Sequence, residues 1–189
     1  MTVTDTHTQS SAGRPSSAST GEEAAGPVER TAAEAAPGGS GKEAADLLRF
    51  PDSLALCIIA AVFTTGSNPH AVRNVVRRYV SRHGRSDGAR ALQYSIAGVG
   101  GARPWAVEVV ENRKPANTHP GAPLKAEVIE RAVQLMVDLD IDTVPDLRAA
   151  VTESPEANPV LEGWTRLPSQ SSGATYRHLL TIAGLVPEP

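Results

Sequence analysis

The chain has 189 residues and a formal net charge of −3, so its overall charge does not indicate a nucleic-acid partner, and any basic surface has to be local. Aromatic residues make up only 4% of it, so a core must be built from aliphatic side chains and alanine, which favours helices over sheets. The single cysteine, Cys57, excludes an internal disulfide and a four-cysteine iron–sulfur cluster.

Residues 1–44 are dominated by Ser, Thr, Ala, Gly, Pro and Glu, and no Leu, Ile or aromatic residue precedes Leu47. Such a segment buries too little apolar surface to offset its conformational entropy, which predicts a disordered tail at 1–44 and a folded domain at 45–189. The first residues do not show the basic start and following apolar stretch of a secretory signal, so no such signal is predicted. The longest apolar run, 54–63, is too short to span a bilayer, so we expect a cytoplasmic protein without a membrane partner.

The domain is predicted to be all-α, because apolar residues recur at spacings of three and four and no stretch alternates with period two. Residues 54–63 (LALCIIAAVF) are apolar on every side, which is typical of a helix enclosed by others. Asn68 and Pro69 are suited to cap and begin the next helix, and residues 112–123 form a predicted loop. The predicted helices cover residues 54–63, 69–82, 89–96, 104–111, 124–139, 146–151, 158–166 and 174–183.

The helix predicted at 69–82 has a basic face. Its apolar residues share one side, while Arg77 and Arg78 point the opposite way and Arg73 lies on a flank. Between Arg73 and Arg90 there are six arginines and one acidic residue. Guanidinium groups along a helix suit a phosphate backbone, and a solvated outer face is the alternative interpretation.

Residues 167–173 (LPSQSSG) form a predicted tight connection between two helices. If a helix begins at Ser172 or Gly173, its first N–H groups can hold a phosphate, and the hydroxyls of Ser171 and Ser172 add donors. Taken alone, the spacing favours an ordinary serine-capped turn. The histidines do not cluster and no metal-binding spacing occurs, so neither a metal nor a cofactor is predicted.

Several of these segments together resemble endonuclease III and its relatives, the helix-hairpin-helix DNA glycosylase superfamily. Residues 124–129 (LKAEVI) match a Lys-Ala helix of that family, and residues 144–150 (VPDLRAA) match the acidic turn and short helix that follow it. Residues 167–174 fall where the family has its hairpin signature Leu-Pro-Gly-Val-Gly-Arg-Lys-Thr-Ala. The closest likeness is to small actinobacterial members, above all at residues 118–127 (THPGAPLKAE). The resemblance implies a multi-helix orthogonal bundle that binds duplex DNA, including damaged duplexes.

The chain also departs from this family at its catalytic positions. Ser169 and Ser171 stand where the hairpin has glycines, and Gly173 stands where the family has its catalytic lysine. The catalytic aspartate belongs to a stretch beyond the second hairpin helix, which the sequence to Pro189 does not contain.

We therefore expect a DNA-binding protein of the base-excision-repair type without glycosylase or lyase activity. Its expected DNA contacts are Arg73, Arg77, Arg78, Lys125, Ser171, Ser172 and Gly173. One alternative is an active glycosylase or lyase whose catalytic residue is His119 or Asp146. Another is a non-enzymatic interaction domain or a truncated remnant, and a more distant one is a haem peroxidase, as some relatives are labelled, although no haem-ligand pattern supports it.

Overall fold

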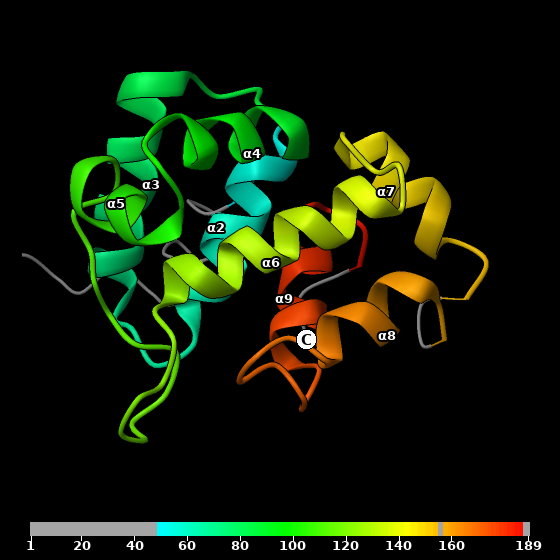
Figure 1. Cartoon of the computed structure of the whole chain (residues 1–189). Coiled ribbons are helices and arrows are strands. Elements are labelled where there is room, and N and C mark those ends of the chain that lie inside the picture. Colours follow the sequence, from blue (N-terminus) through cyan, green and yellow to red (C-terminus); the bar gives the residue numbers. More distant parts are fainter. Residues whose placement is uncertain (1–48, 155–156, 187–189) are drawn as a thin grey trace, which may run out of the picture. The chain divides into compact units, whose positions relative to one another are not determined.

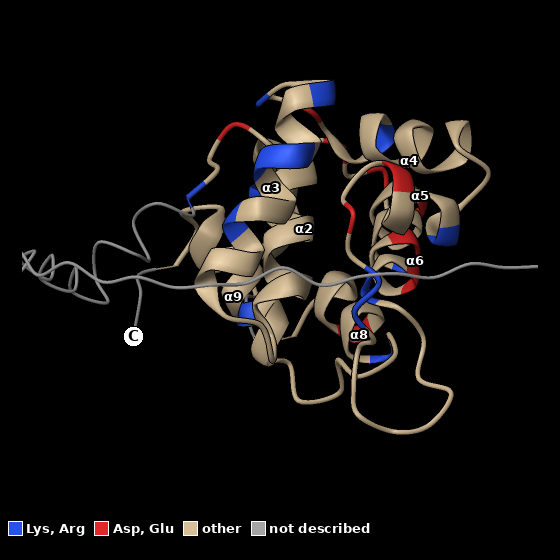
Figure 2. Ribbon diagram, turned by 90° about the vertical axis from the view of Figure 1, so that its left-hand side faces the viewer, with Lys and Arg blue, Asp and Glu red and all other residues tan. Residues whose placement is uncertain are grey.

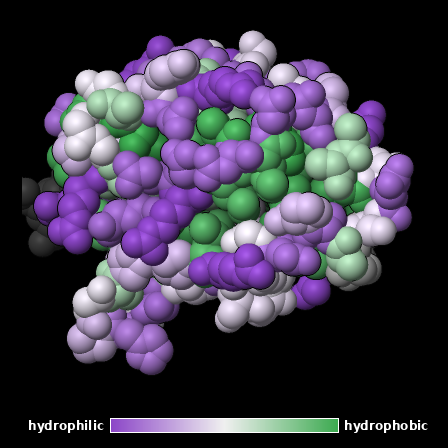
Figure 3. All heavy atoms as spheres, turned by 45° about the vertical axis from the view of Figure 1, so that its right-hand side comes forward, coloured by the Kyte–Doolittle hydropathy of each residue, from purple (hydrophilic) through white to green (hydrophobic). Residues whose placement is uncertain are grey.

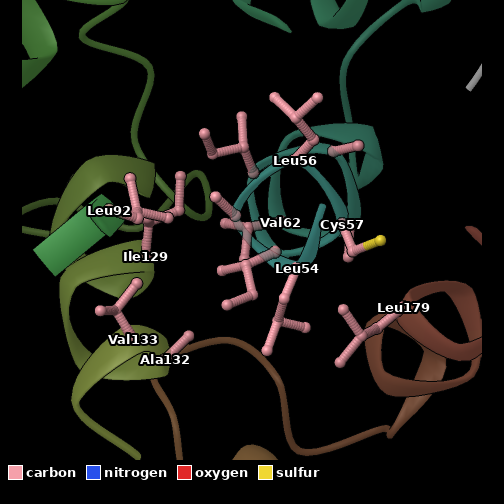
Figure 4. Packing of buried hydrophobic residues seen from close by; sticks show 14 of the residues in the cluster. Leu54, Leu56, Cys57, Val62, Leu92, Ile129, Ala132, Val133 and Leu179 are labelled. Atoms are coloured by element: carbon pink, nitrogen blue, oxygen red, sulfur yellow. The ribbon is translucent and has the colours of Figure 1, made fainter. Parts of the chain in front are cut away.

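Helix α2 (Leu54–Thr64) lies at the centre of the helical part of the chain and packs against α3, α4, α6 and α9. All residues from 54 to 63 are buried, as expected for a helix that is apolar on every side. Figure 4 shows α2 side chains facing Leu92, Ile129 and Val133 on one side and Leu179 on another. Ser53 caps α2 by accepting a hydrogen bond from the Leu56 N–H at 3.2 Å.

The computed structural model describes residues 49–154 and 157–186 (Figure 1). These residues form eight α-helices and no strand, which confirms the predicted all-α class. Besides α2, the helices are α3 (Pro69–His83), α4 (Ala89–Gly98), α5 (Ala102–Glu108), α6 (Lys125–Asp138), α7 (Val144–Val151), α8 (Pro159–Thr165) and α9 (Ala174–Ile182). None of the helices in this part of the chain is long and apolar enough to cross a bilayer.

The chain divides into two units, residues 1–37 and 38–189, and every described residue belongs to the second. The predicted disordered tail at 1–44 and its boundary with the domain lie outside the described residues. The orthogonal-bundle arrangement of the glycosylase type is finer than the all-α class and stays a prediction.

Most helix boundaries follow from local capping. Asn68 caps α3 by accepting from the Ala71 N–H at 2.7 Å, as the sequence predicts, and Asn158 caps α8 in the same way. Helix α5 begins at Ala102 rather than at the predicted Pro104, because the Glu130 carboxylate of α6 accepts the Ala102 N–H at 3.1 Å. A partner on another helix is not visible in local sequence.

Two buried tryptophans have hydrogen-bonded indole N–H groups. Trp105 donates to the Ser95 hydroxyl at 3.0 Å, and Trp164 donates to the Thr175 hydroxyl at 2.9 Å. Both rings therefore fill the core without leaving a polar group unsatisfied.

On one face of the unit, hydrophobic side chains gather in the middle and hydrophilic ones surround them (Figure 3).

Candidate nucleic-acid interface

The outer face of α3 is polar and basic. Val72, Val75, Val76 and Tyr79 are buried, whereas His70 and Arg77 are exposed and Arg73 is half-buried. Arg77 donates from Nη2 to the side-chain oxygen of Asn74, one turn earlier. Arg73 and Arg77 are thus placed as predicted, on the part of α3 that does not face the core.

Arg78 is held by the end of α5 instead of standing beside Arg77. Its Nη1 donates to the Val110 carbonyl at 3.1 Å, and its Nη2 lies 3.1 Å from the Glu111 carboxylate. Arg78 is thus paired within the protein at a partly exposed position, and its contact with DNA stays a prediction. Helical periodicity gave its direction correctly but could not identify the acidic partner 33 residues away.

Lys125 is buried, with only 2% of its surface exposed, and it is removed from the expected DNA contacts. Its ammonium group donates to the carbonyls of Val62 and Thr65 at 2.6 and 2.7 Å, and it lies 5.8 Å from the centre of the Phe63 ring. These are orphan acceptors at the C-terminal end of α2, where a positive charge is also favoured by the helix dipole. Burial and the nearby charge of Lys114 lower the pKa of Lys125 to about 8.

The loop at 112–124 folds back on itself between α5 and α6. A β-bridge joins Pro115 to Leu124, and the Ala116 N–H donates to the Pro123 carbonyl at 2.8 Å. At the tip, His119 is exposed and its backbone N–H donates to the Asn117 side chain at 2.9 Å. The base of the loop is fastened to the end of α2, because the Lys114 ammonium donates to the Gly66 carbonyl.

The connection between α8 and α9 keeps a backbone conformation that is typical of glycine. Ser169 has a φ of 64°, in the left-handed region, at the position where the hairpin signature has its first glycine. Gly173 has a φ of 67° and caps α9, so the second helix begins where the sequence predicts. Ser171 and Ser172 are exposed, and with Gly173 and Arg177 they line a hollow of about 330 Å³. The acidic side chain of Glu162 lines the same hollow.

Three segments that are distant in the sequence, 64–86, 112–126 and 167–186, are joined pairwise by hydrogen bonds. Lys114 bonds to Gly66, Asn117 donates to Ser169 at 2.8 Å, and His178 lies 3.1 Å from the Thr64 hydroxyl. Together we call these segments the basic region. None contains an Asp or Glu. Segment 64–86 has five arginines, of which Arg78 is paired with Glu111, and 167–186 has Arg177. Segment 112–126 has the exposed Arg113 and Lys114 besides the buried Lys125.

The basic region differs in charge from the rest of the unit. Figure 2 shows Lys and Arg on α3, on α9 and in the loop at 112–124, whereas α5 and α6 carry both acidic and basic residues. A net charge of −3 therefore conceals a local excess of positive charge. Sequence reasoning identified its parts on α3 and at 171–173. It missed Lys114, Asn117 and His178, because contacts between distant segments leave no local pattern.

The two residues named as alternative catalytic groups have ordinary surroundings. Asp146 completes the capping box of α7, whose N-cap is Thr143: it accepts from the N–H and the hydroxyl of Thr143, both at 2.8 Å, and these hydrogen bonds lower its pKa. His119 lies at an exposed loop tip, where its backbone N–H donates to the Asn117 side chain and its carbonyl accepts from the Ala122 N–H at 3.1 Å. Among the described residues, no three His, Cys, Asp or Glu side chains are grouped as metal ligands.

A family model described as a domain of unknown function, DUF8548, matches residues 29–187. The chain therefore belongs to this family. No curated protein and no solved structure matches the chain.

Proposed function

We propose that the protein binds duplex DNA through its basic region, as a base-excision-repair-type protein that does not excise bases. The observation that carries the proposal is the joining of three acid-free segments by the Lys114–Gly66, Asn117–Ser169 and His178–Thr64 contacts. A surface with several cations gains affinity for duplex DNA by releasing the counterions condensed on the DNA, and the acidic residues next to these segments, Glu111 and Glu162, lower that gain.

The α8–α9 connection supports duplex DNA as the partner. The left-handed backbone at Ser169 and Gly173 keeps the turn tight, and Ser171 and Ser172 are exposed beside the first turn of α9. The N–H groups of Gly173 and Ala174 are already bonded, to the Gln170 carbonyl and the Ser172 hydroxyl, so the exposed serine hydroxyls are the donors offered to phosphate oxygens. The resemblance to helix-hairpin-helix proteins points to the same partner.

Neither of two positions at which a catalytic lysine could act offers a free amine, which supports binding without lyase chemistry. Gly173, at the position of the family's lysine, has no side chain that could attack a sugar carbon. The amine of Lys125 is covered by the carbonyls that it binds at the end of α2. An active enzyme would have to use another group, and Asp146 is already engaged in capping α7.

The test is the affinity of the full chain for a short duplex with one abasic site, followed by fluorescence anisotropy. Arg77→Ala should weaken binding several-fold, whereas Arg148→Ala, an exposed arginine of α7 outside the basic region, should not. Equal effects of the two variants, or no binding at low salt, would contradict the proposal. Incubation with damaged duplexes should release no base, and with borohydride present it should give neither strand cleavage nor a covalent adduct. Any of these products would show that the chain is an enzyme.

A further inference from the structure

Helix α3 is an edge helix whose outer side forms one continuous stripe. It has 15 residues, packs mainly on α2, and spans about 22 Å. At about 100° per residue, His70, Asn74, Arg77 and Ser81 lie within about 60° of one another, opposite the buried valines and Tyr79. An α-helix with one free side of this kind has dimensions that fit the major groove of B-form DNA.

Within this stripe the guanidinium of Arg77 is oriented by its neighbours. Arg77 Nη2 donates to Asn74 Oδ1, and Asn74 Nδ2 lies 3.2 Å from His70 Nδ1. The amide of Asn74 therefore bridges the two residues. A guanidinium group has five N–H donors in a rigid plane, so one bond to Asn74 leaves donors for a further planar acceptor pair.

We propose that α3 reads base edges in the major groove, with Arg77 contacting a guanine and with Asn74 and His70 acting as positioning residues. This inference rests on the proposed DNA binding and adds sequence selectivity to it. Neutralising a phosphate needs only a charge nearby, whereas the O6 and N7 acceptors of guanine need two parallel N–H bonds. The Asn74 bridge supplies that orientation, and the absence of acidic residues from 64–86 lets the stripe approach DNA.

The experiment starts with selection of duplexes from a randomised library by the full chain. Anisotropy then compares the selected duplex with a scrambled one for wild type, Arg77→Lys, Asn74→Ala and Arg148→Lys. Arg77→Lys keeps the charge but loses the planar fork, so the ratio of the affinities for the selected and the scrambled duplex should fall about tenfold. Asn74→Ala should reduce the preference in the same direction without removing any charge, and Arg148→Lys should leave it intact.

The outcomes separate this inference from the proposed function. DNA binding without an enriched sequence, or a preference that survives Arg77→Lys, would overturn base reading by α3 and leave DNA binding in place. No binding to any duplex would overturn both. Thermal melting of each variant, expected to match wild type because Asn74 and Arg77 lie on the outer face of α3, shows that the fold is intact.

Discussion

Asn117 donates a hydrogen bond from Nδ2 to Oγ of Ser169 at 2.8 Å, across 52 residues of sequence. The bond joins the loop before α6 to the connection between α8 and α9. Ser169 is therefore both the residue that keeps the left-handed backbone of this connection and the acceptor that fixes the loop against it. Its side chain has a role that the glycine of the hairpin signature could not have.

Substitutions at Ser169 separate these two roles. Ser169→Ala keeps the left-handed strain but loses the bond to Asn117, so the free energy of unfolding should fall by about 1 kcal/mol. Ser169→Gly also loses the bond but relieves about 1 kcal/mol of strain, which should bring it close to wild type. Urea denaturation measures the unfolding free energies of the two variants and of wild type. An alanine variant as stable as the glycine variant would show that φ at residue 169 is not left-handed.

Removing the ammonium of Lys125 should destabilise the fold. Lys125→Met keeps most of the side-chain volume but leaves the carbonyls of Val62 and Thr65 without their donor, at an expected cost of about 3 kcal/mol in unfolding free energy. Lys114→Met is the matched control, since its exposed ammonium also bonds a carbonyl at the end of α2 and should cost less than about 1 kcal/mol. Equal losses in chemical denaturation would argue against the buried role of Lys125.

Lys125 should also make stability depend on pH. Its pKa is about 8 in the folded protein and 10.5 in an ordinary setting, so between these values the unfolded chain binds more protons. The unfolding free energy of wild type should therefore rise with pH from about 8 to about 10, relative to Lys125→Met. Denaturant titrations of both proteins at several pH values give this difference, and a difference that is flat or falls with pH would contradict the burial of the amine.

Two glycines near the ends of α4 should respond oppositely to alanine. A Cβ at Gly88 would lie 2.5 Å from the backbone oxygen of Asp142, which also accepts the Ala89 N–H at 2.8 Å. Gly88→Ala should therefore cost more than about 2 kcal/mol of unfolding free energy. A Cβ at Gly98 meets nothing within 4 Å, so Gly98→Ala should stabilise by up to about 1 kcal/mol. If the melting temperatures of Gly88→Ala and Gly98→Ala shifted in the same direction from wild type, the close contact of Gly88 with Asp142 would be refuted.

The helices were largely predictable because their signals are local. The apolar run at 54–63 and the cap Asn68 act within a turn of the residues they organise. Boundaries were missed where a partner comes from elsewhere, as at Ala102, whose N–H is accepted by Glu130.

The candidate site was predictable only in part, for the same reason. The spacing of the apolar residues of α3 shows that Arg77 points away from the core. This orientation follows from the helix alone and does not depend on contacts with another segment. Lys125 looked like a surface cation because it lies off the apolar stripe of its own helix, but its long side chain reaches the end of α2. The ion pair of Arg78 could not be predicted either, since Glu111 belongs to a segment whose position depends on the whole fold.

The most direct test of the account is the salt dependence of binding to the abasic duplex, measured by anisotropy with the full chain. Wild-type affinity should fall at least tenfold between about 50 and about 200 mM salt, as expected for several phosphate contacts. The double variant Arg73→Ala/Arg77→Ala should bind about tenfold more weakly with a shallower salt dependence, while Arg148→Ala should follow wild type. Binding that is insensitive to salt, or equally weakened by the α7 variant, would contradict a DNA interface in the basic region.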